Sequence, residues 1–252
     1  MPKPFLALAA GVIALAGLGV SLLPADTAHA SAASLAKTEP VLLELFTSQG
    51  CSSCPPADQL AEKLAADPGL VVISRPVTYW DRLGWKDSLA REDNTALQHV
   101  YAAAGLKGQN GVYTPQLVVD GRFGTVGSRE AEVRSGIARH GSKGSAAIRL
   151  RDLGAKGVAV GIDGTAARPA ELVLVAAKRK AEVAIARGEN GGRKVGYTNV
   201  LKNEQRLQSW DGGKASLVIT PEQLAVAGAN RYALVLREPD GGKVLAARWL
   251  RQ

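Results

Sequence analysis

The distribution of apolar residues along the first third of the chain predicts a strand, a helix and a second strand. Residues 41–46 form a mostly apolar run, which is typical of a strand buried on both faces. We expect a helix to begin near Cys54, because Pro55 and Pro56 are tolerated in a first helical turn. Residues 70–73 form the second strand, which should run parallel to the first with a right-handed crossover. The apolar stripe of the helix is expected at Ala57, Leu60, Ala61 and Leu64.

The chain up to residue 142 predicts another helix, a hairpin and a last helix. Residues that cap or stop helices, and an Asp-Gly turn between two apolar runs, set the expected boundaries. The expected elements are an aromatic loop over residues 78–86, a helix capped by Asp87 or Ser88 and ended by Gly105, a strand over residues 113–119, a turn at Asp120-Gly121, a returning strand over residues 122–126 and a helix capped by Ser128. They predict an α/β domain over residues 41–142, with the order βαβ, an extra helix, then ββα.

Beyond residue 146 the pattern changes to short apolar runs separated by glycine-rich turns. Such spacing predicts a mostly antiparallel β-rich domain over residues 146–252 and favours a β-sandwich. The apolar runs lie at residues 148–151, 158–160, 172–175, 217–219 and 232–236, and the turns at residues 190–192, 211–213 and 240–242.

Residues 1–30 have the features of a secretory signal peptide. Lys3 precedes a long apolar run, and Ala28-His29-Ala30 places small residues at the two positions that a signal peptidase reads. We therefore expect cleavage near Ala30, a linker over residues 31–40, and a periplasmic or secreted protein. An uncleaved membrane anchor also remains open, since about 20 apolar residues can span a bilayer.

Length and charge narrow the classes of protein. A chain of 252 residues is long enough for two domains. Its net charge of +8 comes from scattered Lys and Arg residues without interleaved aromatic residues, so we expect a solubilising excess and no nucleic-acid partner. The sequence has no Ser-His-Asp arrangement, P-loop or dinucleotide-binding fingerprint.

The two cysteines of the chain, Cys51 and Cys54, carry the strongest chemical signal. A disulfide between cysteines this close in sequence closes almost no loop and so stabilises the fold little. Redox chemistry therefore explains the pair better than a structural role does. The unpaired N–H groups and the partial positive charge of a helix start stabilise a thiolate and lower the pKa of the thiol. We expect Cys51 to be the outermost sulfur and the nucleophile, and Cys54 to be buried and to resolve the mixed disulfide.

A second part of the site is expected at Thr114-Pro115. A proline that opens a central strand is unusual, so we predict a cis peptide bond that exposes a backbone edge to a partner. Gln49 and Thr114 are assigned to the margin of the site, because each lies next to one of its halves in sequence.

Three residues of the aromatic loop have two interpretations each. Trp80 and Trp85 would either form a rim beside the dithiol or bury their own loop. Asp81 would either assist proton transfer to the buried cysteine or brace the loop.

Several motifs together resemble the thioredoxin superfamily, and more closely an exported thioredoxin-like branch known as the domain of unknown function 1223 family. The matching stretches are residues 44–58, which include Cys-Ser-Ser-Cys-Pro-Pro-Ala-Asp, residues 79–87 and residues 112–121. A weaker match covers residues 187–193 and continues to Asn199-Val200. The resemblance extends over nearly the whole chain after the signal segment. It implies a thioredoxin-like fold and export, but no substrate, because the family has no settled activity.

The chain departs from the family pattern at two places. Pro76-Val77-Thr78 stands where the family tends to carry His-Val-Asp, and Thr198 stands where it often carries His. Any acid–base or metal role of that first histidine is therefore absent here.

Metal binding is the rival chemistry. A cuprous site needs thioether or imidazole beside thiolate, but the only Met is the initiator, and only His99 and His140 follow the signal segment. A zinc site would lack its second ligand pair. We therefore expect no metal, and no cofactor besides the Cys51–Cys54 disulfide.

The favoured hypothesis is a thiol–disulfide oxidoreductase that acts on protein thiols or disulfides, with a redox partner protein. One alternative is a non-catalytic protein that binds a partner and keeps a quiet structural disulfide. Another is a copper or redox carrier without turnover. The sequence does not set the direction of electron flow.

Overall fold

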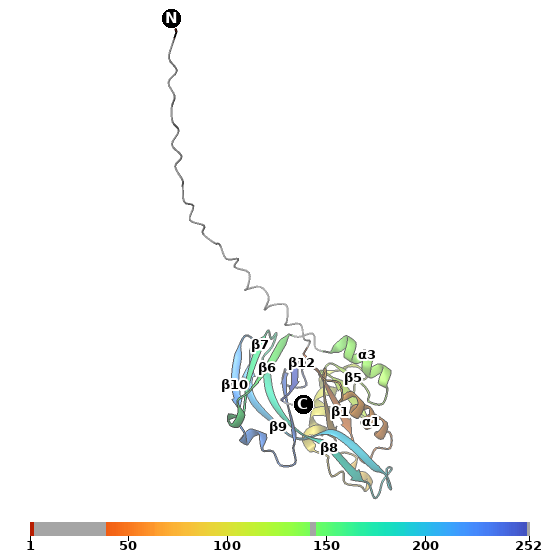
Figure 1. Ribbon diagram of the computed structural model, residues 1–252. Coiled ribbons are helices and arrows are strands. Elements are labelled where there is room, and N and C mark those ends of the chain that lie inside the picture. Colours follow the sequence, from red (N-terminus) through yellow and green to blue (C-terminus); the bar gives the residue numbers. More distant parts are fainter. Residues whose placement is uncertain (3–38, 142–144, 251–252) are drawn as a thin grey trace. The chain divides into compact units, whose positions relative to one another are not determined.

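The computed structural model describes residues 1–2, 39–141 and 145–250, and Thr38–Gln252 form one compact unit. The predicted signal peptide beyond residue 2, and the linker as far as residue 38, lie outside the described residues. The compact unit is a mixed α/β structure with one nine-stranded sheet and few helices (Figure 1). None of the helices among the described residues has the length and apolar character needed to cross a bilayer.

Among the described residues, the α-helices all precede β6, and strands predominate after it. The nine-stranded sheet contains β1 (Val41–Thr47), β2 (Leu70–Pro76), β3 (Lys107–Gly108), β4 (Gln116–Val119), β5 (Phe123–Val126), β8 (Ala170–Ala184), β9 (Lys194–Trp210), β11 (Arg231–Arg237) and β12 (Val244–Trp249). The second sheet contains β6 (Ala146–Asp152), β7 (Val158–Gly164) and β10 (Ala215–Ile219). The α-helices are α1 (Pro55–Leu64), α2 (Glu92–Ala104) and α3 (Glu130–His140), and short 3-10 helices are η1 (Asp81–Leu83), η2 (Gly154–Lys156) and η3 (Glu222–Leu224).

The expected strand–helix–strand unit is present at the start of the compact unit. β1 and β2 pair in parallel, from Val41 opposite Leu70 to Thr47 opposite Pro76. All four residues of the predicted stripe of α1 are buried, and they pack against β1, β2 and β4. Each buried leucine contributes about 1.5–3 kcal/mol. This packing holds the first turn of α1 directly after a central strand.

The start of α2 differs from the prediction. The helix begins at Glu92, and neither Asp87 nor Ser88 caps it. The Asp87 carboxylate instead accepts the N–H groups of Leu89 and Ala90, at 2.8 and 3.1 Å. The capping signal in the sequence therefore marks a separate turn that ends before the helix begins.

The hairpin predicted at Asp120-Gly121 is present. β4 and β5 pair antiparallel, and the two turn residues have φ values of 45° and 64°, which is the conformation a tight hairpin turn needs. The cap predicted for the next helix is wrong, because the N-cap of α3 is Arg129 rather than Ser128, and no side chain bonds there.

Four of the later strands, β8, β9, β11 and β12, continue the sheet that β1 to β5 begin. The strand order is β12-β11-β8-β9-β2-β1-β4-β5-β3, so β9 lies beside β2, with Ser74 opposite Val200. The Ser74 hydroxyl donates to the backbone oxygen of Thr198 at 2.7 Å. The Asn199 amide donates to the backbone oxygen of Val72 at 2.9 Å. This arrangement differs from the separate β-rich domain that the sequence indicates, because β9 covers the edge that β2 would otherwise leave open.

The second sheet, with strand order β10-β7-β6, packs on one end of the large sheet. Its contribution to the shared core comes from residues such as Ile148, Val160 and Ile162. The large sheet contributes Leu172, Leu174, Leu234 and Leu236. The two layers at this end resemble the predicted sandwich, although one layer belongs to the sheet shared with the first half.

The long β8–β9 hairpin is the element that was least predictable from the sequence. β8 has 15 residues and β9 has 17, and they pair from Ala170 opposite Trp210 to Ala184 opposite Lys194. In Figure 1 the far end of this hairpin runs past the second sheet to the side of the molecule that carries α1.

A buried cluster of charges lies between the large sheet and α2. The Arg75 guanidinium, at 1% exposure, donates to the carboxylates of Glu44 (2.7 Å) and Glu204 (2.6 Å). Arg237 makes a longer contact with Glu204 (3.5 Å), and the Tyr101 hydroxyl donates to Glu44. These side chains come from β1, β2, β9, β11 and α2, so the cluster ties strands of both halves together.

Candidate functional site

The two cysteines lie in the loop between β1 and α1. Cys51 and Cys54 form a disulfide, with their Cα atoms 5.4 Å apart. The N–H group of Cys51 donates to the backbone oxygen of Ser48, and that of Cys54 donates to Cys51, each at 3.2 Å. Pro55 and Pro56 occupy the first helical positions, as predicted, and Cys54 is the N-cap residue of α1. The disulfide therefore lies at the positive end of a helix.

Both cysteine side chains are buried in the disulfide form. Cys51 and Cys54 are each 0% exposed, whereas Ser52 and Ser53 between them are exposed. This differs from the expectation that Cys51 would be the outermost sulfur, because a segment remote in sequence covers the loop.

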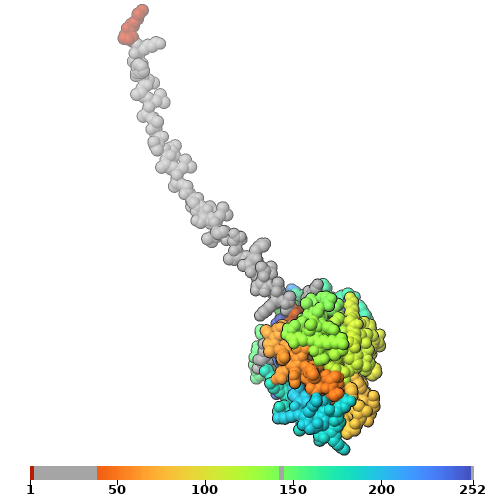
Figure 2. All heavy atoms as spheres, turned by 90° about the vertical axis from the view of Figure 1, so that its right-hand side faces the viewer, coloured from red at the N-terminus to blue at the C-terminus, as the bar shows by residue number. Residues whose placement is uncertain are grey.

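That segment is the tip of the β8–β9 hairpin, residues 185–193, which we call the hairpin tip. The Asn190 side chain is buried, and its Nδ2 atom donates to the backbone oxygens of Gln49 (3.0 Å) and Cys51 (2.8 Å). The Glu189 carboxylate accepts the N–H group of Ser52 at 3.0 Å, and hydrogen bonding to Ser52 lowers the pKa of Glu189. Figure 2 shows the hairpin, in cyan, directly against the orange segment that includes α1.

The sequence of the hairpin tip explains its shape. Gly188 and Gly192 have φ values of 81° and 79°, a region that glycine enters without steric cost. Arg193 donates to Asn190 Oδ1 at 3.1 Å, so the amide that bonds the cysteine loop is itself fixed. The sequence signals for this segment were the glycine-rich turn at residues 190–192 and the weak family match at residues 187–193, and neither indicated a role.

Trp80 connects the cysteine loop with the segment that precedes β4. Its indole N–H group donates to the Thr114 hydroxyl at 2.8 Å. Its Cβ atom lies against Gly50, where an added Cβ would come within 3.2 Å. The Thr114–Pro115 peptide bond is cis, as predicted, and Pro115 is buried. Trp80 therefore both buries its loop and lies beside the disulfide loop.

Hydrogen bonds hold Gln49 in place and link it to Trp85 and, through Asp87, to Asp81. The Gln49 side chain is buried, and its Oε1 atom accepts the indole N–H group of Trp85 at 2.9 Å. The Gln49 N–H group donates to the Asp87 carboxylate at 2.8 Å, and the Asp87 N–H group donates to Asp81 at 3.0 Å. Gln49 and Asp81 thus support the loops from within, which is the bracing role considered for Asp81.

Asp58 is the site residue that the sequence reasoning missed. It lies on α1 one turn after Cys54 and is 2% exposed, and neither carboxylate oxygen has a hydrogen-bond partner among the described residues. Burial raises the pKa of Asp58 well above its ordinary value; the Thr47 hydroxyl opposes this rise and the nearby Asp87 adds to it. The sequence signal that could have identified Asp58 is its place beside the apolar stripe of a helix that begins near Cys54.

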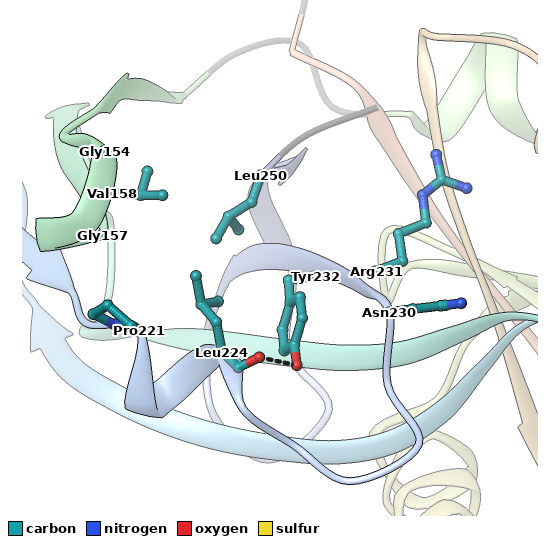
Figure 3. Close-up of a pocket in the computed structure, with 9 residues that line it drawn as sticks. All are labelled: Gly154, Gly157, Val158, Pro221, Leu224, Asn230, Arg231, Tyr232 and Leu250. Carbon is teal, nitrogen blue, oxygen red and sulfur yellow. Dashed lines mark hydrogen bonds between the residues drawn. The ribbon is translucent and has the colours of Figure 1, made fainter.

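A pocket elsewhere in the compact unit has a different character. It has a volume of about 330 Å³ and is lined by the apolar side chains of Val158, Leu224 and Leu250, which point toward a common space beside Tyr232 (Figure 3). In Figure 3 the Arg231 guanidinium extends away from these groups, and it stacks over Trp249 at 3.8 Å. Neither cysteine lines this pocket.

No metal centre accompanies the disulfide in the described part of the chain. The residues at 1–2, 39–141 and 145–250 contain no group of three or more His, Cys, Asp and Glu side chains placed to hold a metal ion.

A large mixed sheet with few helices, and a Cys-x-x-Cys disulfide at the start of α1, define an α/β protein with a possible dithiol centre. Comparison with known proteins gives the family. The chain belongs to the family of proteins of unknown function designated DUF1223, whose model matches residues 42–237.

Two solved structures are similar to this chain. One is a crystal structure of a protein from Agrobacterium tumefaciens, with 29% sequence identity and a TM-score of 0.71, covering 85% of this chain and 95% of that one. The other is HBP35 of Porphyromonas gingivalis, with 14% identity and a TM-score of 0.52, covering 84% of this chain and 74% of that one. At that identity the second likeness concerns the fold alone. No curated protein matches the chain.

Proposed function

We propose that the protein is a thioredoxin-like thiol–disulfide oxidoreductase that acts through Cys51 and Cys54. The observation that carries the proposal is a disulfide at the N-terminus of α1, directly after the central strand β1. A helix start stabilises a thiolate, so reduction of this disulfide would yield a thiol with a lowered pKa. The βαβ unit that carries the cysteines supports the thioredoxin-like assignment.

The proposed exchange starts from the reduced dithiol and a substrate disulfide, and a thiol of a redox partner protein must reduce the Cys51–Cys54 bond again before the next turnover. The Cys51 thiolate attacks one sulfur of that disulfide, forms a mixed disulfide and expels the other sulfur as a thiolate. Cys54 loses its proton and attacks the Cys51 sulfur, which releases the second substrate sulfur and restores the Cys51–Cys54 bond. Two electrons pass from the dithiol to the substrate, and the reverse sequence oxidises a substrate dithiol.

Asp58 is the group that we assign to the proton of Cys54. Side chains on a helix lean toward its N-terminus, so a carboxylate one turn after Cys54 is directed toward that residue. Its pKa, which burial raises, suits a group that exchanges a proton with the Cys54 thiol. The bracing contacts of Asp81 make it the weaker candidate for this role.

The hairpin tip sets a condition on the reaction. Both sulfurs are buried, and Asn190 and Glu189 bond the backbone of the cysteine loop, so we infer that a protein substrate reaches Cys51 only when these contacts open. We therefore propose protein thiols or disulfides as substrates, bound beside Trp80 and Thr114 after the tip has moved.

A second candidate is a partner-binding protein whose disulfide is never exchanged. The complete burial of both cysteines favours it. The reduction potential separates the two: a value above about −250 mV fits an exchanging site, and a value below about −300 mV fits an inert bridge.

We also propose that the protein is exported and loses its first 30 residues. The sequence features at Lys3 and Ala28-His29-Ala30 support this proposal, as does the disulfide, since such bonds persist in oxidising compartments. Mass determination of the protein from its native host would give the mature N-terminus, and an intact Met1 would contradict cleavage.

The decisive experiment traps partner proteins as mixed disulfides. A Cys54→Ala variant retains the attacking sulfur but not the resolving one, so it should accumulate mixed disulfides with partner proteins in the native host. The matched control is the double variant Cys51→Ala/Cys54→Ala, which should hold none. Absence of adducts in the single variant, combined with a potential below about −300 mV, would favour the quiet disulfide.

A further inference from the structure

We propose that a cationic cleft outside the disulfide site binds a small anion that carries two or more phosphate or carboxylate groups. The cleft has a volume of about 580 Å³. The end of α2, the β4–β5 turn, the end of α3 and the turn between β11 and β12 enclose it.

The cleft carries an excess of positive charge. Lys107, Arg122, Arg139, Arg168 and Lys243 line it. Only two carboxylates, Glu238 and Asp240, line it as well, and the one ion pair between these sets joins Arg168 and Glu238 at 3.9 Å. Five cations facing two acids in one concave space leave a local field that attracts anions.

Arg122 supplies a donor group that a bound anion could use. Its Nε atom is buried and has no hydrogen-bond partner among the described residues. A buried donor without a partner costs about 1–3 kcal/mol, which a bound acceptor would remove. The planar guanidinium fork matches the paired oxygens of phosphate and carboxylate groups.

The backbone gives the cleft a fixed shape. An added Cβ atom at Gly121 would come within 2.5 Å of the backbone oxygen of Gly242, so the two turns touch through their backbones. The N–H group of Val244 donates to the backbone oxygen of Asp120 at 3.0 Å and locks the same contact. Arg122 and Lys243 are therefore mounted on two turns that cannot move apart freely.

The pKa of His140 reflects its burial and the positive charges that line the cleft. Its ring stacks on Phe123, with centroids 4.9 Å apart, which holds it at the wall. Burial lowers the pKa of His140, and Lys107, Arg139 and Arg122 lower it further. A bound anion would offset these neighbouring charges.

The cleft and the disulfide lie at opposite ends of β1. The N–H group of Leu42, near the start of this strand, donates to the Asp120 carboxylate at 2.7 Å, whereas the cysteine loop follows Thr47 at its end. Seven residues of strand span roughly 20 Å. The inference therefore stands independently of the proposed redox function.

Titration calorimetry of the oxidised protein with pyrophosphate, and separately with citrate, tests the proposal at low ionic strength. Saturable binding of one molecule of either anion is expected, and the tighter of the two shows whether phosphate or carboxylate is preferred. Replacement of one cation, in Arg122→Gln or Arg139→Gln, should weaken binding at least about tenfold, since a hydrogen bond to a charged group is lost.

The matched control is Arg134→Gln. Arg134 lies on α3 like Arg139, but pairs with Glu130 at the surface and does not line the cleft, so this change removes the same charge from the same helix. The control should bind as the unaltered protein does. The His140 ring resonances should shift during titration while those of His99 stay in place. Failure of both anions to saturate, or equal weakening by Arg134→Gln and Arg139→Gln, would overturn the proposal.

Discussion

Asp58 is held in a position that lowers the stability of the folded chain. A buried carboxylate without a hydrogen-bond partner destabilises the folded state whenever it is ionised. Folding raises its pKa, so the folded chain binds more protons than the unfolded chain between the two pKa values. The free energy of unfolding therefore falls as pH rises through this interval. A retained cost of this kind is typical of a functional residue.

We expect Asp58→Asn to stabilise the oxidised protein and to impair exchange. The stabilisation should reach roughly 1–3 kcal/mol at about pH 8 and shrink toward zero as pH falls below the ordinary Asp pKa of 3.8, because both states then carry a mainly neutral group. Urea unfolding across this range measures it. The resolving step of the reduced protein with oxidised glutathione should slow about 100-fold, since the proton acceptor is lost.

Glu62→Gln is the matched control for Asp58. It also removes one acid from α1, but Glu62 is half exposed and pairs with Lys180 at the surface. Its effect on the free energy of unfolding should stay within about 0.5 kcal/mol. A stability difference for Asp58→Asn that does not change with pH would show that burial of the ionised carboxylate is not its cause.

The residues of the site were predictable only where the signal is local. Cys51 and Cys54 stand out because their spacing and the following prolines are read within a few positions. Asn190 is 139 residues away from Cys51, and no local pattern connects them. Gln49 lies two residues before Cys51 in sequence, but its contacts with Trp85 and Asp87 arise only in the folded loops.

At the scale of elements, the hairpin tip is the segment that we propose to control access to the disulfide. Asn190→Ala removes both hydrogen bonds that the amide makes to the cysteine loop. Loss of about 1–3 kcal/mol from the closed form should raise the population of the open form, and with it the rate of reduction by dithiothreitol, at least fivefold. Thiol labelling over time measures this rate.

Asn110→Ala serves as the control for Asn190. Its amide also makes two hydrogen bonds, to Leu106 and Ala102, but within the loop after α2. This variant should be reduced at the rate of the unaltered protein. Equal rates for the Asn190 variant would mean that the disulfide is reached without opening of the tip.

The elements were predictable where apolar periodicity is continuous. The pattern located β1, α1, β2 and the β4–β5 hairpin, whose packing residues are neighbours in sequence. It missed β12 and the whole of β9, in which residues 202–209 are mainly polar and carry no strand signal of their own. None of these eight residues is buried, and their pairing with β8 holds them in the sheet.

At the scale of the whole molecule, the buried charge cluster couples the two halves of the sheet. Although burial raises the pKa of Glu204, Arg75 and Arg237 outweigh it and lower that pKa to about 2. The stabilisation from Glu204 is complete above the unfolded pKa of about 4.5 and is lost as pH falls toward 2.

Glu204→Gln should therefore destabilise the protein in a pH-dependent way. The loss should be roughly 3 kcal/mol at about pH 6 and should diminish between about pH 4.5 and pH 2, as urea unfolding would show. Glu171→Gln is the control, because Glu171 pairs with Arg206 near the surface and should contribute about 0–1 kcal/mol. A constant difference down to pH 3 would contradict the assignment.

Because the chain is synthesised from its N-terminus, the cysteines are made before the hairpin tip that contacts them. Cys51 precedes Asn190 by 139 residues, so the ribosome completes the sulfur pair well before it has made the cover. At 5–20 residues per second this interval lasts roughly 7–28 s. During that time the cysteine loop has neither Asn190 nor Glu189 beside it, so an oxidant or thiol that reaches the nascent chain does not have to open these contacts.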